Sequence, residues 1–240
     1  MSLKIESFNN QRFKYYKSLL SNKGLKKAKD FLVFGEKVVA EQQLQYFDDC
    51  IEILYNKPIE NLKLPLVELS QELFDELDIF GTKKPILLMK QRPQKLWDPQ
   101  NKDGIEILLP LGDPSNLGST LRNVGALGSF KFVLLKEAAN PYHPKAVRAA
   151  SGNLFLNEFV FGPSIHELTE PVMVLDSGGK DILEMDFPTQ YRLLVGEEGP
   201  GVPDKENFQK LSIPFRKESE SLNAAFALTC AVFHITSKAK

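Results

Sequence analysis

The sequence predicts an α/β protein with two domains, the second of which is built around a parallel sheet. After about residue 104, strand-like runs alternate with helical ones, and the strands are continuously apolar, as in sheets covered on both faces. Before that, residues 93–103 lose periodicity and contain Pro93 and Pro99, a composition typical of a linker. We therefore expect an N-terminal domain over residues 1–92 and a C-terminal domain over residues 104–240.

The N-terminal domain is expected to be a small α/β unit, because short runs of both periodicities occur in it. The expected helices are Asn10 to Leu20, Glu36 to Tyr46 and the capped helix Ser70 to Leu77. The expected strands are Phe31 to Val33, Ile51 to Tyr55 and Ile86 to Met89.

The C-terminal domain should hold six strands connected mainly by helices. The expected strands are residues 105–111, 130–135, 158–161, 172–176, 192–196 and a last one near 210–214. The expected helices are Ser115 to Leu127, Pro144 to Ala150 and a terminal helix from about Asn223 to Ser237.

Composition limits the class of protein. The chain has 240 residues, 42% of them hydrophobic, which is enough for one or two cores. Its two cysteines, Cys50 and Cys230, have no partners at metal-ligand spacing, which argues against a disulfide framework and a zinc site. No apolar run approaches the ~20 residues that cross a bilayer, and the start lacks a signal-peptide pattern. We expect a cytoplasmic protein without membrane or metal partners.

Charge is distributed unevenly. Residues 1–40 contain nine basic and three acidic residues, a local charge of +6, while the whole chain carries −1. Two interpretations are open: the lysines solvate an exposed helix, or the basic segment contacts RNA phosphates.

Three short segments follow predicted strands: residues 113–118 with Arg122, residues 196–201, and residues 213–214 with 221–223. Ligands of parallel α/β sheets bind beyond the carboxyl ends of the strands, so we expect the three segments to form one pocket.

The first segment contains Ser115 and Asn116, either of which can cap the following helix. Capping does not account for Arg122, which accompanies Leu117, Leu121 and Val124 on that helix. A guanidinium beside apolar residues suggests an anionic partner such as an RNA phosphate.

The second segment has glycines at 196, 199 and 201, which suit either a tight loop or close approach of a ligand. It lacks the patterns of a dinucleotide fingerprint and of a P-loop. Glu198 can bind a ligand or orient another side chain, or it is a solvated loop carboxylate. The sequence Ser177-Gly178-Gly179 is interpreted as a turn at the rim of the site.

In the third segment, Ser219 or Ser221 is expected to cap the terminal helix. Capping leaves Asn223 unexplained. The small residues after it, beginning with Ala224 and Ala225, predict a closely packed helix.

Together the segments resemble the three motifs of the SpoU-type (TrmH-like) RNA ribose 2'-O-methyltransferases of the SPOUT superfamily. Asn116 and Arg122 match the first motif, Glu198 the second, and Ser221 and Asn223 the third. The likeness covers nearly all of residues 105–238. Around Phe31 to Lys37, the N-terminal part is similar, more loosely, to the family's substrate-binding domain of ribosomal-protein L30e type.

The resemblance implies a C-terminal domain with a deep trefoil knot, a homodimer, and S-adenosylmethionine (AdoMet) as cofactor. By motif position, the cofactor would contact Gly196, Ile213 and Leu222, with Leu175 and Gly201 nearby. Arg122 would act either as the base or by gripping a phosphate and stabilising the alkoxide. Asn116, Glu198, Ser221 and Asn223 would orient Arg122, the nucleotide and the cofactor.

The implied activity is methyl transfer to a ribose 2'-hydroxyl of structured RNA. We expect rRNA more than tRNA, because a separate N-terminal domain is present. Two alternatives remain open: a non-catalytic RNA-binding or ribosome-assembly factor that retains the fold, and an enzyme that methylates a base.

Overall fold

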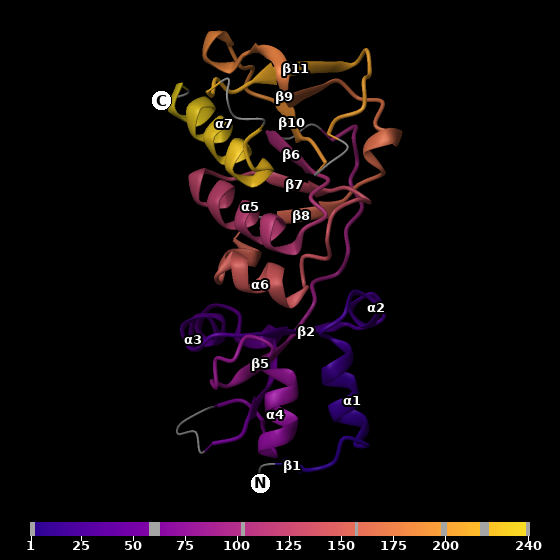
Figure 1. Ribbon diagram of the computed structural model, residues 1–240, viewed down its shortest axis with the longest axis vertical. Coiled ribbons are helices and arrows are strands. Elements are labelled where there is room, and N and C mark those ends of the chain that lie inside the picture. The colour runs from indigo at the N-terminus through magenta and orange to yellow at the C-terminus, as the bar shows by residue number, and fades with distance from the viewer. Residues whose placement is uncertain are drawn as a thin grey trace. The chain divides into compact units, whose positions relative to one another are not determined.

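Two compact units make up the chain in the computed structural model (Figure 1). The N-terminal unit comprises residues 1–93 and 140–152, and the C-terminal unit comprises residues 94–139 and 153–240. The structure describes residues 3–57, 63–101, 104–156, 158–197, 201–216 and 221–238. Within these ranges, the helices are all too short or too polar to span a bilayer.

A mixed sheet of five strands forms the centre of the N-terminal unit, in the order β1-β4-β3-β5-β2. The strands are β1 (Leu3–Ile5), β2 (Asp30–Val33), β3 (Cys50–Tyr55), β4 (Leu66–Leu69) and β5 (Ile86–Lys90). β3 pairs parallel with β4 and antiparallel with β5. The expected α/β character of this part of the chain is confirmed.

The helices of this unit are α1 (Gln11–Ser18), α2 (Asn22–Leu25), α3 (Glu36–Gln45), α4 (Gln71–Leu77) and α6 (Pro144–Ala150). Asn10 and Ser70 cap α1 and α4 by accepting hydrogen bonds from backbone N–H groups, as helix N-caps do. Sequence analysis missed β1, α2 and β4, because segments of three or four residues are too short to show a period.

Residues 140–152 pack with the N-terminal unit although they follow the first two strands of the C-terminal sheet in sequence. The Arg92 N–H donates to the Tyr142 hydroxyl (3.0 Å), and the Gln42 side-chain amide donates to the Gly152 carbonyl (3.1 Å). The Arg148 guanidinium lies 4.3 Å from the centre of the Phe80 ring. Polar and aromatic contacts thus hold α6 in this unit.

A parallel sheet of six strands forms the C-terminal unit, in the order β11-β9-β10-β6-β7-β8. The strands are β6 (Ile105–Leu109), β7 (Lys131–Leu134), β8 (Glu158–Phe161), β9 (Val172–Asp181), β10 (Tyr191–Val195) and β11 (Phe208–Ser212). The central strands are buried along nearly their whole length, as the continuous apolar runs predicted. The expected parallel sheet is confirmed.

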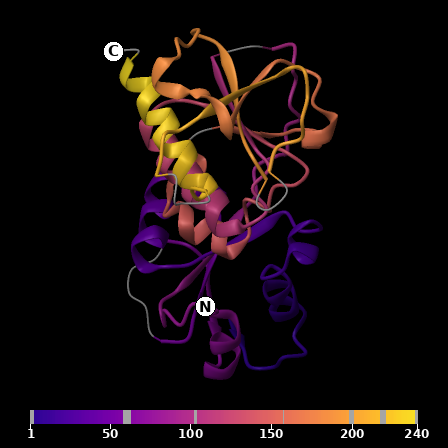
Figure 2. The same ribbon diagram turned by 45° about the horizontal axis from the view of Figure 1, so that its top comes forward.

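Two helices, α5 (Pro114–Leu127) and α7 (Ala224–Lys238), pack against each other in this unit (Figures 1 and 2). α5 buries Leu117, Leu121 and Val124, while α7 buries residues of its own including Ala225 and Ala231. The small residues of α7 permit this close packing. Residues 198–200 and 217–220 lie outside the described ranges, so the trefoil knot stays a prediction.

Candidate functional site

A cavity of about 550 Å³ lies at the carboxyl ends of β9, β10 and β11, where ligands of α/β sheets bind. Its volume is within the range of about 300–1,000 Å³ that is usual for small-molecule sites. Eight of the ten residues expected at the site line this cavity: Asn116, Leu175, Gly196, Gly201, Ile213, Ser221, Leu222 and Asn223. Among the described residues, no group of three or more acidic, histidine or cysteine side chains is arranged to hold a metal.

The first motif contributes Asn116, in the first turn of α5, to the cavity lining. The helix is capped by Asp113, whose carboxylate accepts hydrogen bonds from the N–H groups of Ser115 (2.8 Å) and Asn116 (2.9 Å). The expectation that Ser115 or Asn116 caps the helix was wrong, because the cap precedes Pro114 and these two residues already belong to the first turn. Asn116 therefore does not cap α5, and it lines the cavity.

Asn223 connects the third motif to the first. Its side-chain amide donates to the Asn116 side-chain oxygen (3.1 Å), and its own oxygen accepts the Phe226 N–H (3.1 Å). Asn223 therefore caps α7 and ties that helix to the start of α5. The expected cap at Ser219 or Ser221 was wrong: Asn223 makes the side-chain cap, Ser221 lines the cavity, and Ser219 lies outside the described residues.

The described ends of the second motif, residues 196–197 and 201, meet beside the cavity. Glu197 and Gly201 exchange two backbone hydrogen bonds of 2.9 and 3.1 Å, and Gly201 has φ +77°, a conformation that favours glycine. A side chain at Gly196 would meet Val202 at 3.1 Å, so both glycines suit the backbone of the loop. Glu198 lies outside the described residues, and its expected role stays a prediction.

The cavity wall also includes an irregular stretch of β9. Lys210 of β11 pairs with Val174, but the next residue, Leu211, pairs with Lys180, so residues 175–179 have no register partner on β11, while Leu175 still pairs with Val195 of β10. Leu175, Asp176 and Ser177 of this stretch line the cavity. The interpretation of residues 177–179 as a turn was wrong, because they lie within β9 as a bulge.

Gly179 fits this bulge because it has no side chain. A Cβ atom at this position would lie 2.4 Å from the backbone of Lys210 and Leu211. The close approach of β9 and β11 therefore depends on glycine at this position. It determines where the β9 residues that line the cavity lie.

Two carboxylates that sequence analysis did not assign to the site line the cavity, those of Asp176 and Glu197. Asp176 lies 3.7 Å from the Lys210 ammonium and also accepts the Gly178 N–H (2.8 Å). The Glu197 carboxylate lies 3.8 Å from the His166 ring nitrogen. They give the cavity an acidic side, which suits a ligand with positive charge. The sequence signal for Asp176 was its position at the end of an apolar strand.

Arg122 does not line the cavity. It lies six residues beyond Asn116 on α5, about 120° around the helix, and its side chain is exposed. The expectation of a guanidinium beside apolar core residues was wrong, because the apolar residues face inward while Arg122 faces outward. Among the described residues, its guanidinium has no ion-pair partner.

Residues 106–233 match the sequence model of the SpoU rRNA Methylase family. The chain belongs to this family. The matched range includes both Asn116 and Asn223, so the hydrogen bond between them joins two parts of the family region.

Three similar proteins illustrate the extent of the likeness. "Ribosomal RNA small subunit methyltransferase G 2" of Syntrophobacter fumaroxidans is 36% identical over 96% of this chain, which spans 48% of that protein. "23S rRNA (guanosine(2553)-2'-O)-methyltransferase RlmP" of Bacillus subtilis is 29% identical over 96% of this chain and 98% of its own. The crystal structure of the SpoU methyltransferase AviRb from Streptomyces viridochromogenes with AdoMet has a TM-score of 0.77 and 24% identity, covering 96% of this chain and 98% of that one. The chain thus spans about half the length of the first of these family relatives and nearly all of the other two.

We expect Asn223→Ala to weaken AdoMet binding at this cavity while leaving the fold intact. The substitution removes the cap of α7, which costs about 1 kcal/mol, and the bond to Asn116. AdoMet affinity measured by calorimetry should fall about tenfold. The matched control is Thr236→Ala, which removes a side-chain bond to Val232 near the other end of α7 and should leave affinity unchanged. Equal effects of the two changes would contradict the role of Asn223.

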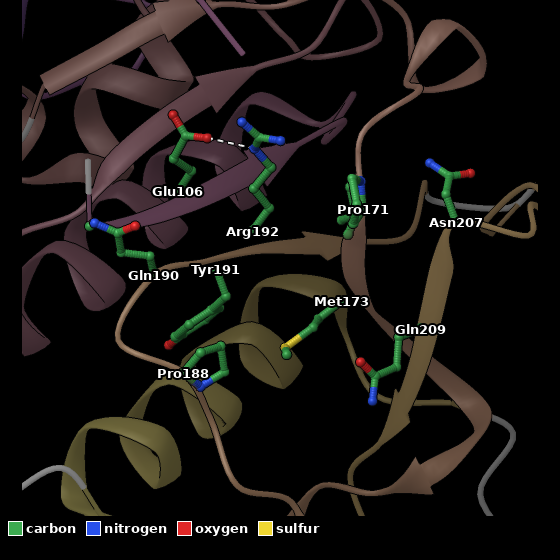
Figure 3. Close-up of a pocket in the computed structure, with 11 residues that line it drawn as sticks. Glu106, Pro171, Met173, Pro188, Gln190, Tyr191, Arg192, Asn207 and Gln209 are labelled. Atoms are coloured by element: carbon green, nitrogen blue, oxygen red, sulfur yellow. Dashed lines mark hydrogen bonds and ion pairs between the residues drawn. The ribbon is translucent and has the colours of Figure 1, made fainter. Parts of the chain in front are cut away.

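A second cavity, of about 260 Å³, lies at the amino ends of the same strands (Figure 3). A dashed line in Figure 3 joins the Glu106 carboxylate to the Arg192 guanidinium. The two groups lie 2.7 Å apart, and both side chains are buried. Tyr191 forms another part of the wall, and burial raises its pKa to about 12, so it stays neutral. The residues of the three motifs that the structure describes do not line this cavity. We assign the reaction to the first cavity for that reason.

Proposed function

We propose that this chain is an AdoMet-dependent methyltransferase that acts on a ribose 2'-hydroxyl of rRNA. The observation that carries the proposal is the Asn116–Asn223 hydrogen bond, which brings the first and third family motifs together over one cavity. The printed name of the Bacillus subtilis relative, with which the chain aligns almost completely, supports the 2'-hydroxyl as acceptor and rRNA as substrate.

The cavity fits AdoMet by its chemistry. Leu175, Ile213 and Leu222 offer apolar surface for an adenine ring, and the loop backbones at Gly196 and Gly201 offer hydrogen-bonding groups. Asp176 and Glu197 place negative charge beside a ligand whose sulfonium and ammonium groups give it net positive charge. When bound, AdoMet supplies a methyl group activated by the sulfonium.

The residues of this chain then have to orient a 2'-hydroxyl and help it lose its proton, because a hydroxyl is a weak nucleophile. Asn116 and Asn223 are hydrogen-bonded to each other, and their amide groups form a polar part of the cavity lining. We place the ribose beside them. We assign to Arg122 the binding of the adjacent phosphate and the stabilisation of the developing alkoxide, since a free guanidinium keeps its proton above about pH 12. Glu198 and Ser221 are proposed to orient these groups.

We further propose that the active form is a homodimer. Phe226, Cys230 and Phe233 lie at positions i, i+4 and i+7 of α7 and are all exposed, with 67% and 61% of the two phenylalanines accessible. An exposed apolar stripe of this kind indicates a protein interface. Because Arg122 lies outside the cavity of its own chain, we propose that each cavity receives the Arg122 side chain of the partner chain.

The test of this function is methyl transfer into RNA. Purified protein is incubated with AdoMet and rRNA from a strain that lacks the gene, and the RNA is digested to nucleosides for mass spectrometry. We expect one 2'-O-methylated nucleoside. A methylated base would instead support base methylation, and RNA binding without any heat of AdoMet binding would support a non-catalytic factor.

A further inference from the structure

The N-terminal unit contains a hollow of about 410 Å³ at the corner between α1 and α2. Its walls include Tyr15, Ser18, Ser21 and Gly24, and Lys23 and Lys27 lie beside them. A Cβ atom at Gly24 would lie 1.9 Å from the Ser18 carbonyl oxygen, so the two helices approach as closely as their backbones allow. The Ser21 hydroxyl donates to the same carbonyl (3.0 Å) and accepts the Gly24 N–H (3.2 Å). The shape of the hollow is therefore determined by the backbone contacts and hydrogen bonds between α1 and α2.

The segment that forms the hollow carries charged side chains of positive sign only. Between Arg12 and Lys29 the chain has seven basic residues and no acidic one. Two of them are neutralised locally, since Arg12 pairs with Glu52 and Lys17 pairs with Glu76. The other five are exposed and have no ion pair within the described part of the chain: Lys14, Lys23, Lys26, Lys27 and Lys29.

Asp30, the first carboxylate after these lysines in the sequence, forms no ion pair with them in the described part of the chain. Asp30 accepts a hydrogen bond from the Tyr15 hydroxyl (2.5 Å), so it is held against the aromatic wall. Burial and this carboxylate raise the pKa of Tyr15, which stays neutral and leaves the hollow without a second negative group. Several like charges on one corner repel one another, and this repulsion is relieved when a polyanion binds.

We propose that the α1–α2 corner is the surface by which the N-terminal unit grips RNA, with backbone phosphates bound at the hollow by Lys23 and Lys27. This inference rests on the proposed function for the choice of RNA as the polyanion. The Tyr15 ring supplies an apolar wall against which a sugar or base packs, a combination of cations and aromatic surface that suits nucleic acid without demanding a particular sequence.

The experiment measures binding of full-length protein to a fluorescein-labelled RNA hairpin of about 20 base pairs across a range of salt concentrations. The double variant Lys23→Gln/Lys27→Gln should bind about tenfold more weakly at physiological salt. Its slope of log affinity against log salt should be less steep by about 1.4–1.8, because each lost phosphate contact accounts for about 0.7–0.9. Lys23→Arg/Lys27→Arg should restore both values.

The matched control, Lys95→Gln/Lys136→Gln, removes the same charge from two exposed lysines that are paired with Glu158 and Glu167. It should bind the hairpin nearly as wild type does. An unchanged affinity and slope in the Lys23/Lys27 variant overturns the proposal, and so does wild-type protein that fails to bind the hairpin. AdoMet binding, followed in parallel by calorimetry, should be equal in all variants. If wild-type protein binds RNA through Lys23 and Lys27 but transfers no methyl group, the proposed function fails while this inference stands.

Discussion

Arg122→Ala should abolish most methyl transfer while leaving AdoMet affinity within about twofold of wild type. The side chain is exposed and does not line the cavity, so its loss removes nothing that the cofactor touches. Loss of one charged group that stabilises a developing negative charge lowers turnover by about 10²–10³-fold. Single-turnover transfer of a labelled methyl group to rRNA, with calorimetry of AdoMet, measures the two quantities separately.

Asn123→Ala is the matched control, because Asn123 is the exposed neighbour of Arg122 on α5. It should retain nearly full activity. Arg122→Lys keeps the charge but not the planar fork, and should recover only part of the rate. Activity of Arg122→Ala close to that of Asn123→Ala would exclude a role for the guanidinium.

Mixing two defective variants tests whether Arg122 serves a partner's cavity, provided that the AdoMet concentration is low enough to fill mainly the cavities that keep Asn223. A mixed dimer contains one Arg122→Ala chain and one Asn223→Ala chain. If Arg122 acts across the interface, the cavity of the Arg122→Ala chain keeps its own Asn116–Asn223 pair and receives the intact Arg122 of the partner. If Arg122 acts within its own chain, neither cavity of the mixed dimer is complete. For action across the interface, random pairing should restore about one quarter of wild-type sites. Absence of any recovery in dimers shown to be mixed would place Arg122 in its own chain's site.

Glu106→Gln should destabilise the C-terminal unit more than any other single change considered above. Glu106 is paired across three neighbouring strands, with Arg192 on β10 and Lys131 on β7 as its register partners. Its carboxylate lies 2.7 Å from Arg192 and 3.3 Å from Lys131, and accepts the Trp97 indole N–H at 3.0 Å. Removing the negative charge leaves the buried Arg192 without compensation, which costs about 3–5 kcal/mol.

Urea unfolding measures this change well, because Trp97 is the single tryptophan of the chain and contacts the altered group. The control is Glu158→Gln, which breaks an exposed pair with Lys95 and should cost about 0–1 kcal/mol. Replacing Glu106 and Arg192 together by apolar residues should cost less than Glu106→Gln alone, since the buried guanidinium is then removed with its partner and only the partly exposed Lys131 loses its pair. Equal midpoints for Glu106→Gln and the control would show that the buried network contributes little.

The fold could be predicted from sequence because its main elements are long and periodic. β6 and β10 are apolar except for one charged residue each, Glu106 and Arg192, and α5 has apolar residues at helical spacing, so class and order followed from pattern alone. The five-residue excursion of β9 could not be predicted, because it depends on how closely β11 approaches Gly179.

The site was predicted in part for a similar reason. Motif positions at strand ends indicated that Asn116, Gly196 and Asn223 share one cavity, which the topology of a parallel sheet requires. The cap at Asp113 and the outward direction of Arg122 depend on helix start and rotation, which a spacing pattern determines only to within a residue or two. Asp176 and Glu197 were missed because single carboxylates near loops are common.

The crowded contact at Gly179 determines which parts of the donor cavity are open to redesign. Accommodating a synthetic donor with a bulkier alkyl group calls for trimming Leu175 or Ser177, which face the cavity. Adding even one methyl group at position 179 would force the two strand backbones apart and dislodge those same residues. The donor cavity can therefore be enlarged by substitutions of residues that face it, whereas substitution of Gly179 between the two strands would disrupt it.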